Sequence, residues 1–302
     1  MARDWETTFS NWTGPASDAE EDRYKWTRNA INDALTEYPA LRDYSFKVYA
    51  KGSYPNFTNV VRDSDVDVAA ELTEFIQNSF IHDAIGLSLQ ALGRSVYTGG
   101  YSLPRFKDDV EQALIGKFGQ TAVDRGKKAI HIRESRQGLA ADVVPCVTHR
   151  TWTSRANYRE GIRLQHDDRP WEEIVNYPAQ HLACGTEKND RTYKRYKRVV
   201  RILKRLENEM VDKGVIAEVP SFLIESAVWN VADASFAATT WTGRVQNALA
   251  HIFNGTMSSD CVQSDEWLEA NAIKYLFHSS QNWTYEQAHE FASRAWDYVG
   301  LP

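Results

Sequence analysis

Two kinds of hydrophobic spacing alternate along the first half of this chain. Apolar and polar residues alternate in residues 44–50 and 65–72, which predicts β-strands. Strand-like runs also occur at KAIHIR (128–133) and LAADVVPCV (139–147). Between these strands a four-residue repeat predicts one face of a helix, formed by Phe106, Val110, Leu114 and Phe118. The first half therefore predicts a sheet accompanied by helices.

Helix start and stop signals frame further elements. A capping box at Ser17-Asp18-Ala19-Glu20 predicts the start of a helix that runs to about Tyr38. A second capping box joins Thr284 to Gln287, and Gly300 is a stop signal after it. Residues 75–105 fit either a helix or a loop. The helical reading rests on the spacing of Ile81, Ile85 and Leu89.

The second half is predicted to be mostly helical. A polar stretch, 149–170, is expected to cross between two lobes. Asn189-Asp190 predicts the start of a long helix that runs to about Val211. Three further helices are predicted near residues 238–254, 264–278 and 284–298. We therefore expect an α/β fold: a mixed, twisted sheet with helices in residues 1–155, a helical lobe in residues 156–302, and an active site in the cleft between them.

The composition excludes several classes of protein. Hydrophobic residues make up 42% and charged residues 25%, as in an ordinary soluble globular protein. The net charge of −6 argues against broad, non-specific nucleic-acid binding. No apolar run has the length of a membrane span or a signal peptide, so we expect a cytoplasmic protein. Three cysteines are too few for a disulfide framework, and their spacing to histidines matches no common zinc module well.

Three aspartates carry the candidate chemistry. Asp65 and Asp67 are two residues apart in a predicted strand, so both carboxylates project from one face. Gly52-Ser53 lies twelve residues before Asp65 and offers backbone N–H groups to an anion. Asp142 lies in another predicted strand. Carboxylates together with substrate phosphates suit Mg²⁺, so this arrangement predicts nucleotidyl transfer. An Asp-x-Asp pair also occurs by chance in solvated loops, and the turn and the third aspartate favour the functional interpretation.

The predicted helix up to Val211 carries unusual positive charge for an acidic protein. Arg201 and Lys204 lie three residues apart at the border of its apolar face, and side chains at that spacing can hold one triphosphate from the same side. The alternative is that these charges are merely solvated.

The chain resembles the bacterial cGAS/DncV-like nucleotidyltransferases, and within them the CdnE-like group, a branch of the polymerase-β-like superfamily. The first matching motif is GSYPNFTNVVRDSDVDVAAEL (52–72). Four further motifs follow in order: ADVVPC around Asp142, WEEIVNYPAQH, YKRVVRILKRL and PSFLIESAVWNV. The resemblance runs to about residue 235; after that we recognise only generic helices.

The resemblance implies an enzyme that joins nucleoside triphosphates, such as ATP and UTP, into a cyclic di- or trinucleotide and releases pyrophosphate. Two Mg²⁺ ions, with Mn²⁺ as a substitute, would be held by Asp65, Asp67 and Asp142. Gly52, Ser53, Arg201, Lys204 and Ser221 would contact phosphates, and Phe222 would stack on the donor base in place of the more usual Tyr. The product would act on an effector protein in CBASS anti-phage signalling, and the enzyme would be a monomer without a stable nucleic-acid or membrane partner.

Other functions remain open at this point. A linear polymerase, or an enzyme that nucleotidylates a protein, RNA or small molecule, would use the same three aspartates. A catalytically silent nucleic-acid-binding module would have no need of them. Asn176 is our match to a position thought to read a base edge in the CdnE-like group, because its amide can donate to and accept from uracil. It is equally suited to capping a turn.

Overall fold

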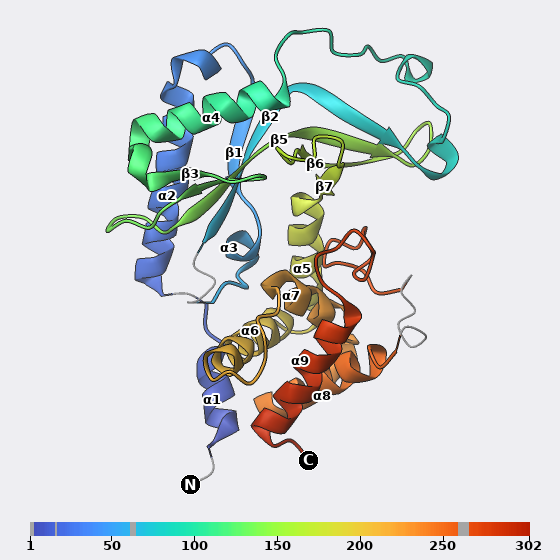
Figure 1. Ribbon diagram of the computed structural model, residues 1–302. Coiled ribbons are helices and arrows are strands. Elements are labelled where there is room, and N and C mark those ends of the chain that lie inside the picture. The colour runs from blue at the N-terminus through green and yellow to red at the C-terminus, as the bar shows by residue number, and fades with distance from the viewer. Residues whose placement is uncertain (1–2, 16, 61–64, 259–265) are drawn as a thin grey trace. The chain divides into compact units, whose positions relative to one another are not determined.

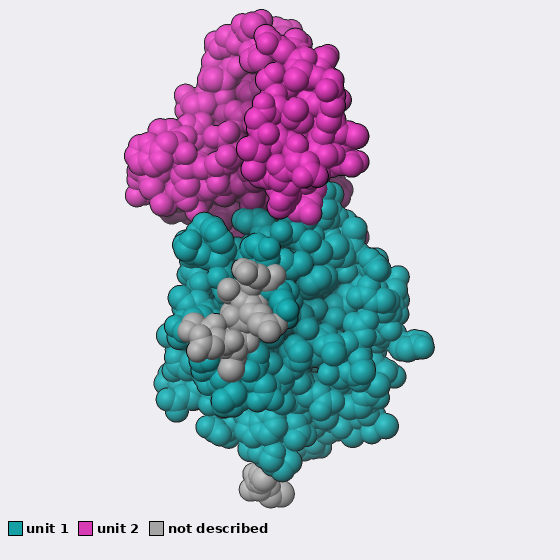
Figure 2. All heavy atoms as spheres, turned by 90° about the vertical axis from the view of Figure 1, so that its right-hand side faces the viewer, with its two compact units in different colours: residues 1–16, 55–63, 179–302 teal, residues 17–54, 64–178 magenta. Residues whose placement is uncertain are grey.

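The chain divides into two compact units, each built from segments that are distant in the sequence. The computed structural model describes residues 3–15, 17–60, 65–258 and 266–302. The sheet unit comprises residues 17–54 and 64–178, and the helical unit comprises residues 1–16, 55–63 and 179–302 (Figure 2). The sheet unit ends at residue 178, later than the boundary expected after residue 155. Residues 1–16 and 55–63 belong to the helical unit, although they precede most of the sheet in sequence.

A single mixed sheet organises the sheet unit (Figure 1). The strand order is β1-β2-β5-β4-β3, and β6 pairs with β5 and β7. Strands β2 and β5 pair in parallel, whereas the other described pairs are antiparallel. The strands are β1 Phe46–Ala50, β2 Val66–Phe80, β3 Val123–Arg125, β4 Ile130–Ile132, β5 Ala141–Trp152, β6 Tyr158–Leu164 and β7 Ile174–Asn176.

The two faces of this sheet differ because residues alternate along each strand. On one face Val66 and Val68 are fully buried in a core formed with α2 (Asp18–Glu37) and α4 (Leu103–Phe118). Asp67 projects from the opposite face. The side chain of Ser17 caps α2, so the predicted start of this helix is confirmed, as is the helix predicted from the four-residue repeat in α4.

Two predictions in the sheet unit were wrong, and one open alternative is decided. The polar stretch 149–170 does not cross between lobes: it completes β5 and forms the hairpin to β6, whose first residues are polar because they are exposed. Strand β2 extends to Phe80, eight residues beyond the prediction, with an irregularity between Leu72 and Ile76. Of the two alternatives for residues 81–89, the structure has the loop, with short turns and no α-helix. Short 3₁₀ turns occur at Pro39–Leu41, His82–Ala84, Gln90–Leu92, Gln120–Ala122 and, in the helical unit, Asp233–Ala237.

The helical unit has its own hydrophobic core, which includes Phe9, Leu203, Val228, Leu249 and Phe291. Phe9 lies on α1, far from the others in sequence. Thr284 and Gln287 form the predicted capping box, and Gly300 ends that helix with a left-handed conformation. The helices are α1 Trp5–Trp12, α5 Pro178–Arg191, α6 Tyr196–Asp212, α7 Ser221–Asn230, α8 Trp241–Gly255 and α9 Tyr285–Val299.

Two helix predictions need correction here. Asn189-Asp190 does not start α6 but lies near the end of α5, and the left-handed backbone of Tyr193 and Lys194 separates the two helices. The N-cap of α6 is Arg195, but Asn189 still bonds to the first turn of this helix, because its Oδ1 accepts the Lys197 N–H at 3.2 Å. Within the predicted helix 264–278, residues 266–278 contain a β-bridge between Leu268 and Tyr275 instead; its first two residues lie outside the described part. Among the helices that the structure describes, none is long and apolar enough to cross a membrane.

Candidate active site

Asp65, Asp67 and Asp142 come together at one end of the parallel strand pair. Asp142 lies on β5 directly opposite Asp67 on β2, and Asp65 precedes β2 by one residue. The side chains of directly paired residues project from the same face, and residues two apart in an extended chain do so as well. The three carboxylates therefore project from one face, away from the apolar core. The ligand atoms of Asp65 and Asp142 lie close together, whereas the carboxylate of Asp67 pairs with Lys51.

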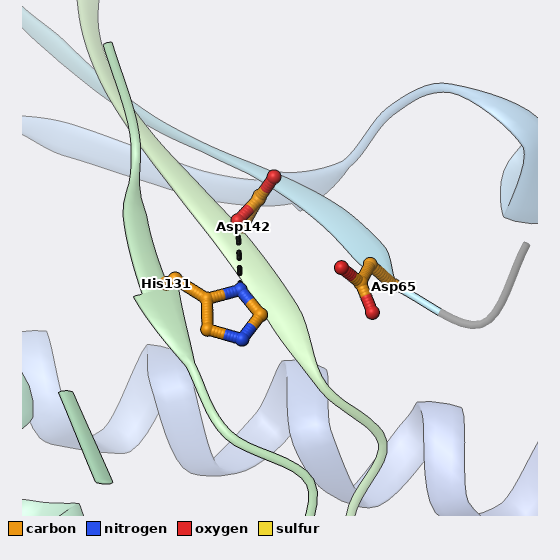
Figure 3. A group of neighbouring side chains, drawn as sticks. All are labelled: Asp65, His131 and Asp142. Atoms are coloured by element: carbon orange, nitrogen blue, oxygen red, sulfur yellow. Dashed lines mark hydrogen bonds and ion pairs between the residues drawn. The ribbon is translucent and has the colours of Figure 1, made fainter. Parts of the chain in front are cut away.

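His131 joins this cluster. It lies on β4 opposite Asp142, and its Nδ1 is 3.1 Å from Asp142 Oδ1 (Figure 3). One ligand atom each from Asp65, His131 and Asp142 lies within 4.8 Å of the others. We did not predict His131, although the run around it was predicted as a strand. Its pairing with Asp142 depends on an antiparallel register that the local pattern does not contain.

The glycine turn packs against the second aspartate. Gly52 has a φ of +74°, and a Cβ at this position would lie 2.5 Å from Asp67 Oδ2. Lys51 Nζ contacts Asp67 Oδ1 at 3.1 Å, and the Lys51 N–H donates to the Asp67 carbonyl at 2.9 Å. Ser53 begins the short helix α3 (Ser53–Asn56). The absence of a side chain at Gly52 therefore allows this turn to approach Asp67 closely.

The electrostatics of this cluster favour a cation. Burial raises the pKa of Asp65, and the negative charges of Asp142 and Asp67 raise it further, while His131 opposes them. Carboxylates crowded in this way repel one another unless a positive charge lies between them. Hard oxygen donors suit a divalent ion, so Asp65, Asp67 and Asp142 fit the Mg²⁺ expected from the sequence.

The basic residues singled out on α6 are buried. Arg201 is 6% exposed, and its guanidinium donates to the carbonyls of Thr13, at 2.8 Å from Nε, and Phe57. Burial lowers the pKa of Arg201 to about 10, so the side chain stays charged at neutral pH. Lys204 is 2% exposed, and its Nζ lies 3.4 Å from a carboxylate oxygen of Glu225. Both cations thus already have protein partners within the helical unit.

Glu225 on α7 is the centre of a buried polar network. It accepts hydrogen bonds from Thr58 Oγ1 and His181 Nε2, each at 2.7 Å. Burial alone would raise the pKa of Glu225, but His181 and Lys204 hold it at about 2. Thr58 belongs to the N-terminal segment 55–60 of the helical unit, so this network ties that segment to α7 within one unit.

The remaining candidates lie on α7 and β7. Ser221 is the first residue of α7, and the ring of Phe222 contacts His181 edge-on at 5.3 Å between centroids. Asn176 ends β7 and lies opposite Ile162, which in turn lies opposite Thr148 on β5. This register places Asn176 on the same sheet face as Asp142. Its counterpart on β5, Thr148, lies six residues, or about 20 Å, beyond Asp142 along that strand.

Comparison with known proteins identifies the family. Residues 183–300 match the family model of the cGAS/DncV-like nucleotidyltransferase C-terminal helical domain. The cyclic dipyrimidine nucleotide synthase CdnE of Cecembia lonarensis is 32% identical over 302 residues, covering 99% of both chains. The chain belongs to the CdnE-like cGAS/DncV-like nucleotidyltransferases.

Solved structures of CdnE proteins share its fold. The Rhodothermus marinus CdnE c-UMP-AMP synthase, solved with Apcpp and Upnpp, has a TM-score of 0.81 at 26% identity and covers 98% of this chain and 97% of its own. The Elizabethkingia meningoseptica CdnE cyclic dinucleotide synthase, solved with GTP and Apcpp, has a TM-score of 0.79 at 30% identity. The match covers 98% of this chain and 99% of its own. Their names and ligands differ in the bases used, so membership of the CdnE group does not fix the bases of the product.

Proposed function

We propose that this CdnE-like nucleotidyltransferase joins two nucleoside triphosphates into a cyclic dinucleotide. In each round a ribose hydroxyl oxygen attacks the α-phosphorus of a triphosphate, the bond to the β-phosphate breaks, and pyrophosphate leaves. The observation that carries the proposal is the placement of Asp65, Asp67 and Asp142 on one sheet face beside the Gly52 turn, in a chain 32% identical over 302 residues to a cyclic dipyrimidine nucleotide synthase.

The three aspartates would hold Mg²⁺, with Mn²⁺ as a substitute. When bound, two such ions lower the pKa of an attacking hydroxyl and neutralise charge on the α-phosphate and the leaving group. The protein supplies fixed positions, because paired strands hold Asp67 and Asp142 side by side before any substrate arrives. Gly52 and Ser53 would present backbone and hydroxyl donors to the β- and γ-phosphates beside Asp67.

The residues of the helical unit would hold the donor nucleotide. Arg201 and Lys204 would bind its triphosphate after exchanging their present partners, the Thr13 and Phe57 carbonyls and the Glu225 carboxylate. Ser221 would contact phosphate, and Phe222 would stack on the base. Asn176 would read a base edge. The cyclic product would signal to an effector protein in CBASS anti-phage defence.

Product analysis tests this function directly. We expect the purified protein, given Mg²⁺ and all four nucleoside triphosphates, to form a phosphatase-resistant cyclic product, detected by mass spectrometry, and Asp65→Asn and Asp67→Asn to form none. Asp43→Asn, an exposed change elsewhere in the sheet unit, is the matched control. Phosphatase-sensitive linear products would identify a polymerase instead. Transfer to an added protein or RNA would identify a nucleotidylating enzyme.

A further inference from the structure

His131 is the feature of the carboxylate cluster that the proposed chemistry leaves unexplained. Its side chain is 37% exposed and lies beside Asp142, which is 41% exposed. Mg²⁺ prefers oxygen ligands, so an imidazole nitrogen is not needed to complete such a site. A histidine that serves only the fold would not have to be aimed at a candidate metal ligand.

The direction of the hydrogen bond follows from the chemistry of the partners. An ionised carboxylate only accepts hydrogen bonds, so Nδ1 must carry the proton that it shares with Asp142 Oδ1 over 3.1 Å. Because Oδ1 already accepts this hydrogen bond, Oδ2 is the less occupied oxygen of Asp142. The hydrogen bond also restricts rotation of the carboxylate, which would otherwise sample several orientations.

The backbone fixes His131 firmly in this place. Its neighbours Ile130 and Ile132 are 0% and 2% exposed and belong to the core on the other face of the sheet. All three residues pair with β5, His131 with Asp142 itself. Because two buried isoleucines and a strand register hold the ring, its donor is preorganised toward Asp142.

We propose that His131 is a positioning residue: its Nδ1–H holds one oxygen of Asp142 and thereby directs the other oxygen toward a divalent ion. This inference rests on the proposed function, because it assumes that Asp142 binds the ion. Hydrogen-bond partners of metal ligands commonly act in this way, and their loss typically weakens metal binding about 10–100-fold. His131 would therefore act on the metal through Asp142 rather than as a ligand.

Two substitutions at one position separate the role of the donor from that of the ring. Asparagine has its amide nitrogen attached to Cγ, as Nδ1 is in histidine, so His131→Asn keeps a donor in nearly the same place. His131→Leu keeps bulk and removes the donor. His278→Leu removes an exposed histidine of the helical unit and controls for metal bound by surface imidazoles. Thermal unfolding of each variant shows whether it remains folded.

Mn²⁺ binding, followed by electron paramagnetic resonance without nucleotide, measures the effect apart from turnover. We expect His131→Leu to raise the Kd for Mn²⁺ about 10–100-fold, and His131→Asn and His278→Leu to stay close to wild type. We expect the spin-echo spectrum of the wild type to show no directly bound imidazole nitrogen.

Three results would overturn the proposal: an unchanged Kd in His131→Leu, a loss in His131→Asn as large as in His131→Leu, or a directly bound imidazole nitrogen. Failure of the wild type itself to bind Mn²⁺ would instead refute the metal centre of the proposed function, so the two failures are distinguishable.

Discussion

At the scale of single residues, Gly52 combines two constraints. Its φ is +74°, and a Cβ would meet Asp67 Oδ2 at 2.5 Å. We expect Gly52→Ala to lower the free energy of unfolding by about 1–2 kcal/mol, the cost of a left-handed conformation with a side chain. We also expect a sharp loss of product formation, because Asp67 must move. Urea denaturation and product assays measure the two effects.

Gly116 offers a matched control for this substitution. It is exposed on α4, and a Cβ there would meet nothing within 4 Å. Gly116→Ala should raise the free energy of unfolding by about 1 kcal/mol, because alanine favours helix, and should leave activity unchanged. Normal activity in Gly52→Ala would show that the close approach of the turn to Asp67 is dispensable.

Asn176 carries the prediction about base choice. If its amide reads a uracil edge, wild-type product contains uridine, and Asn176→Ser shifts incorporation toward purines while total activity is kept. Mass spectrometry of products from equimolar nucleotides measures the composition, with the exposed Asn32→Ser on α2 as control. A purely purine product from the wild type, or an Asn176→Ser product of unchanged composition, would contradict the assignment.

The sequence predicted the three aspartates and the glycine turn but missed His131. Asp65 and Asp67 are visible because an alternation of two is a local property of the chain. Asp142 was found through the apolar strand around it. His131 has no such local signal, since its importance arises only from a register between β4 and β5. A residue whose role depends on strand pairing becomes visible only in the folded sheet.

At the scale of elements, α6 unites a structural and a proposed catalytic task. Arg201→Ala would remove the donor to the part-buried carbonyls of Thr13 and Phe57, which should lower the free energy of unfolding by roughly 1 kcal/mol. It should also raise the KM for nucleoside triphosphate. Arg201→Lys keeps the positive charge but not the fork of donors. It should therefore lose similar stability while raising KM less.

Arg198, which is exposed on the same helix, provides the control: we expect Arg198→Ala to leave both the free energy of unfolding and the KM nearly unchanged. Steady-state kinetics and urea denaturation separate the two tasks of Arg201. If Arg201→Ala loses stability with an unchanged KM, the arginine serves only to anchor the segments around Thr13 and Phe57.

Element boundaries were predictable where a cap marks them and uncertain elsewhere. Ser17 and Thr284 cap α2 and α9 at the predicted positions. The break between α5 and α6 was missed because it depends on positive φ at Tyr193 and Lys194, residue types that do not signal a left-handed turn. The apolar stripe of α6 was recognised correctly, since its period does not depend on where the helix begins.

At the scale of the whole molecule, the sequence does not divide where the units do. Phe9 of α1 is fully buried in the core of the helical unit, and Thr58 is bonded to Glu225 there. Hydrophobic periodicity reports local structure and carries no information about which distant segment completes a core. A predicted boundary between residues 155 and 156 therefore could not anticipate that residues 1–16 and 55–63 belong with the C-terminal helices.

The stability of the sheet unit should depend on pH through His149. Burial, aided by the charge of Arg163, lowers the pKa of His149 to about 4. The Glu173 carboxylate, 3.6 Å from Nε2, favours protonation, but it is half exposed, and the side chain of His149 is 0% exposed, so burial dominates. In the unfolded chain this imidazole titrates near its usual value of about 6.5. Between about pH 4 and pH 6.5 this imidazole is therefore protonated in the unfolded chain and neutral in the folded protein.

The free energy of unfolding should therefore fall as pH decreases below about 6.5, by on the order of 1 kcal/mol at pH 5.5 from this group alone. Urea denaturation at pH 7.5 and 5.5 measures the loss. His149→Gln, which removes the titrating group, should lose correspondingly less, whereas the exposed His278→Gln should behave as wild type. Asp65 acts in the opposite direction, because its raised pKa favours the folded state as pH falls, and this contribution is common to all three proteins. An identical pH dependence in wild type and His149→Gln would show that the buried imidazole takes up its proton in the folded state.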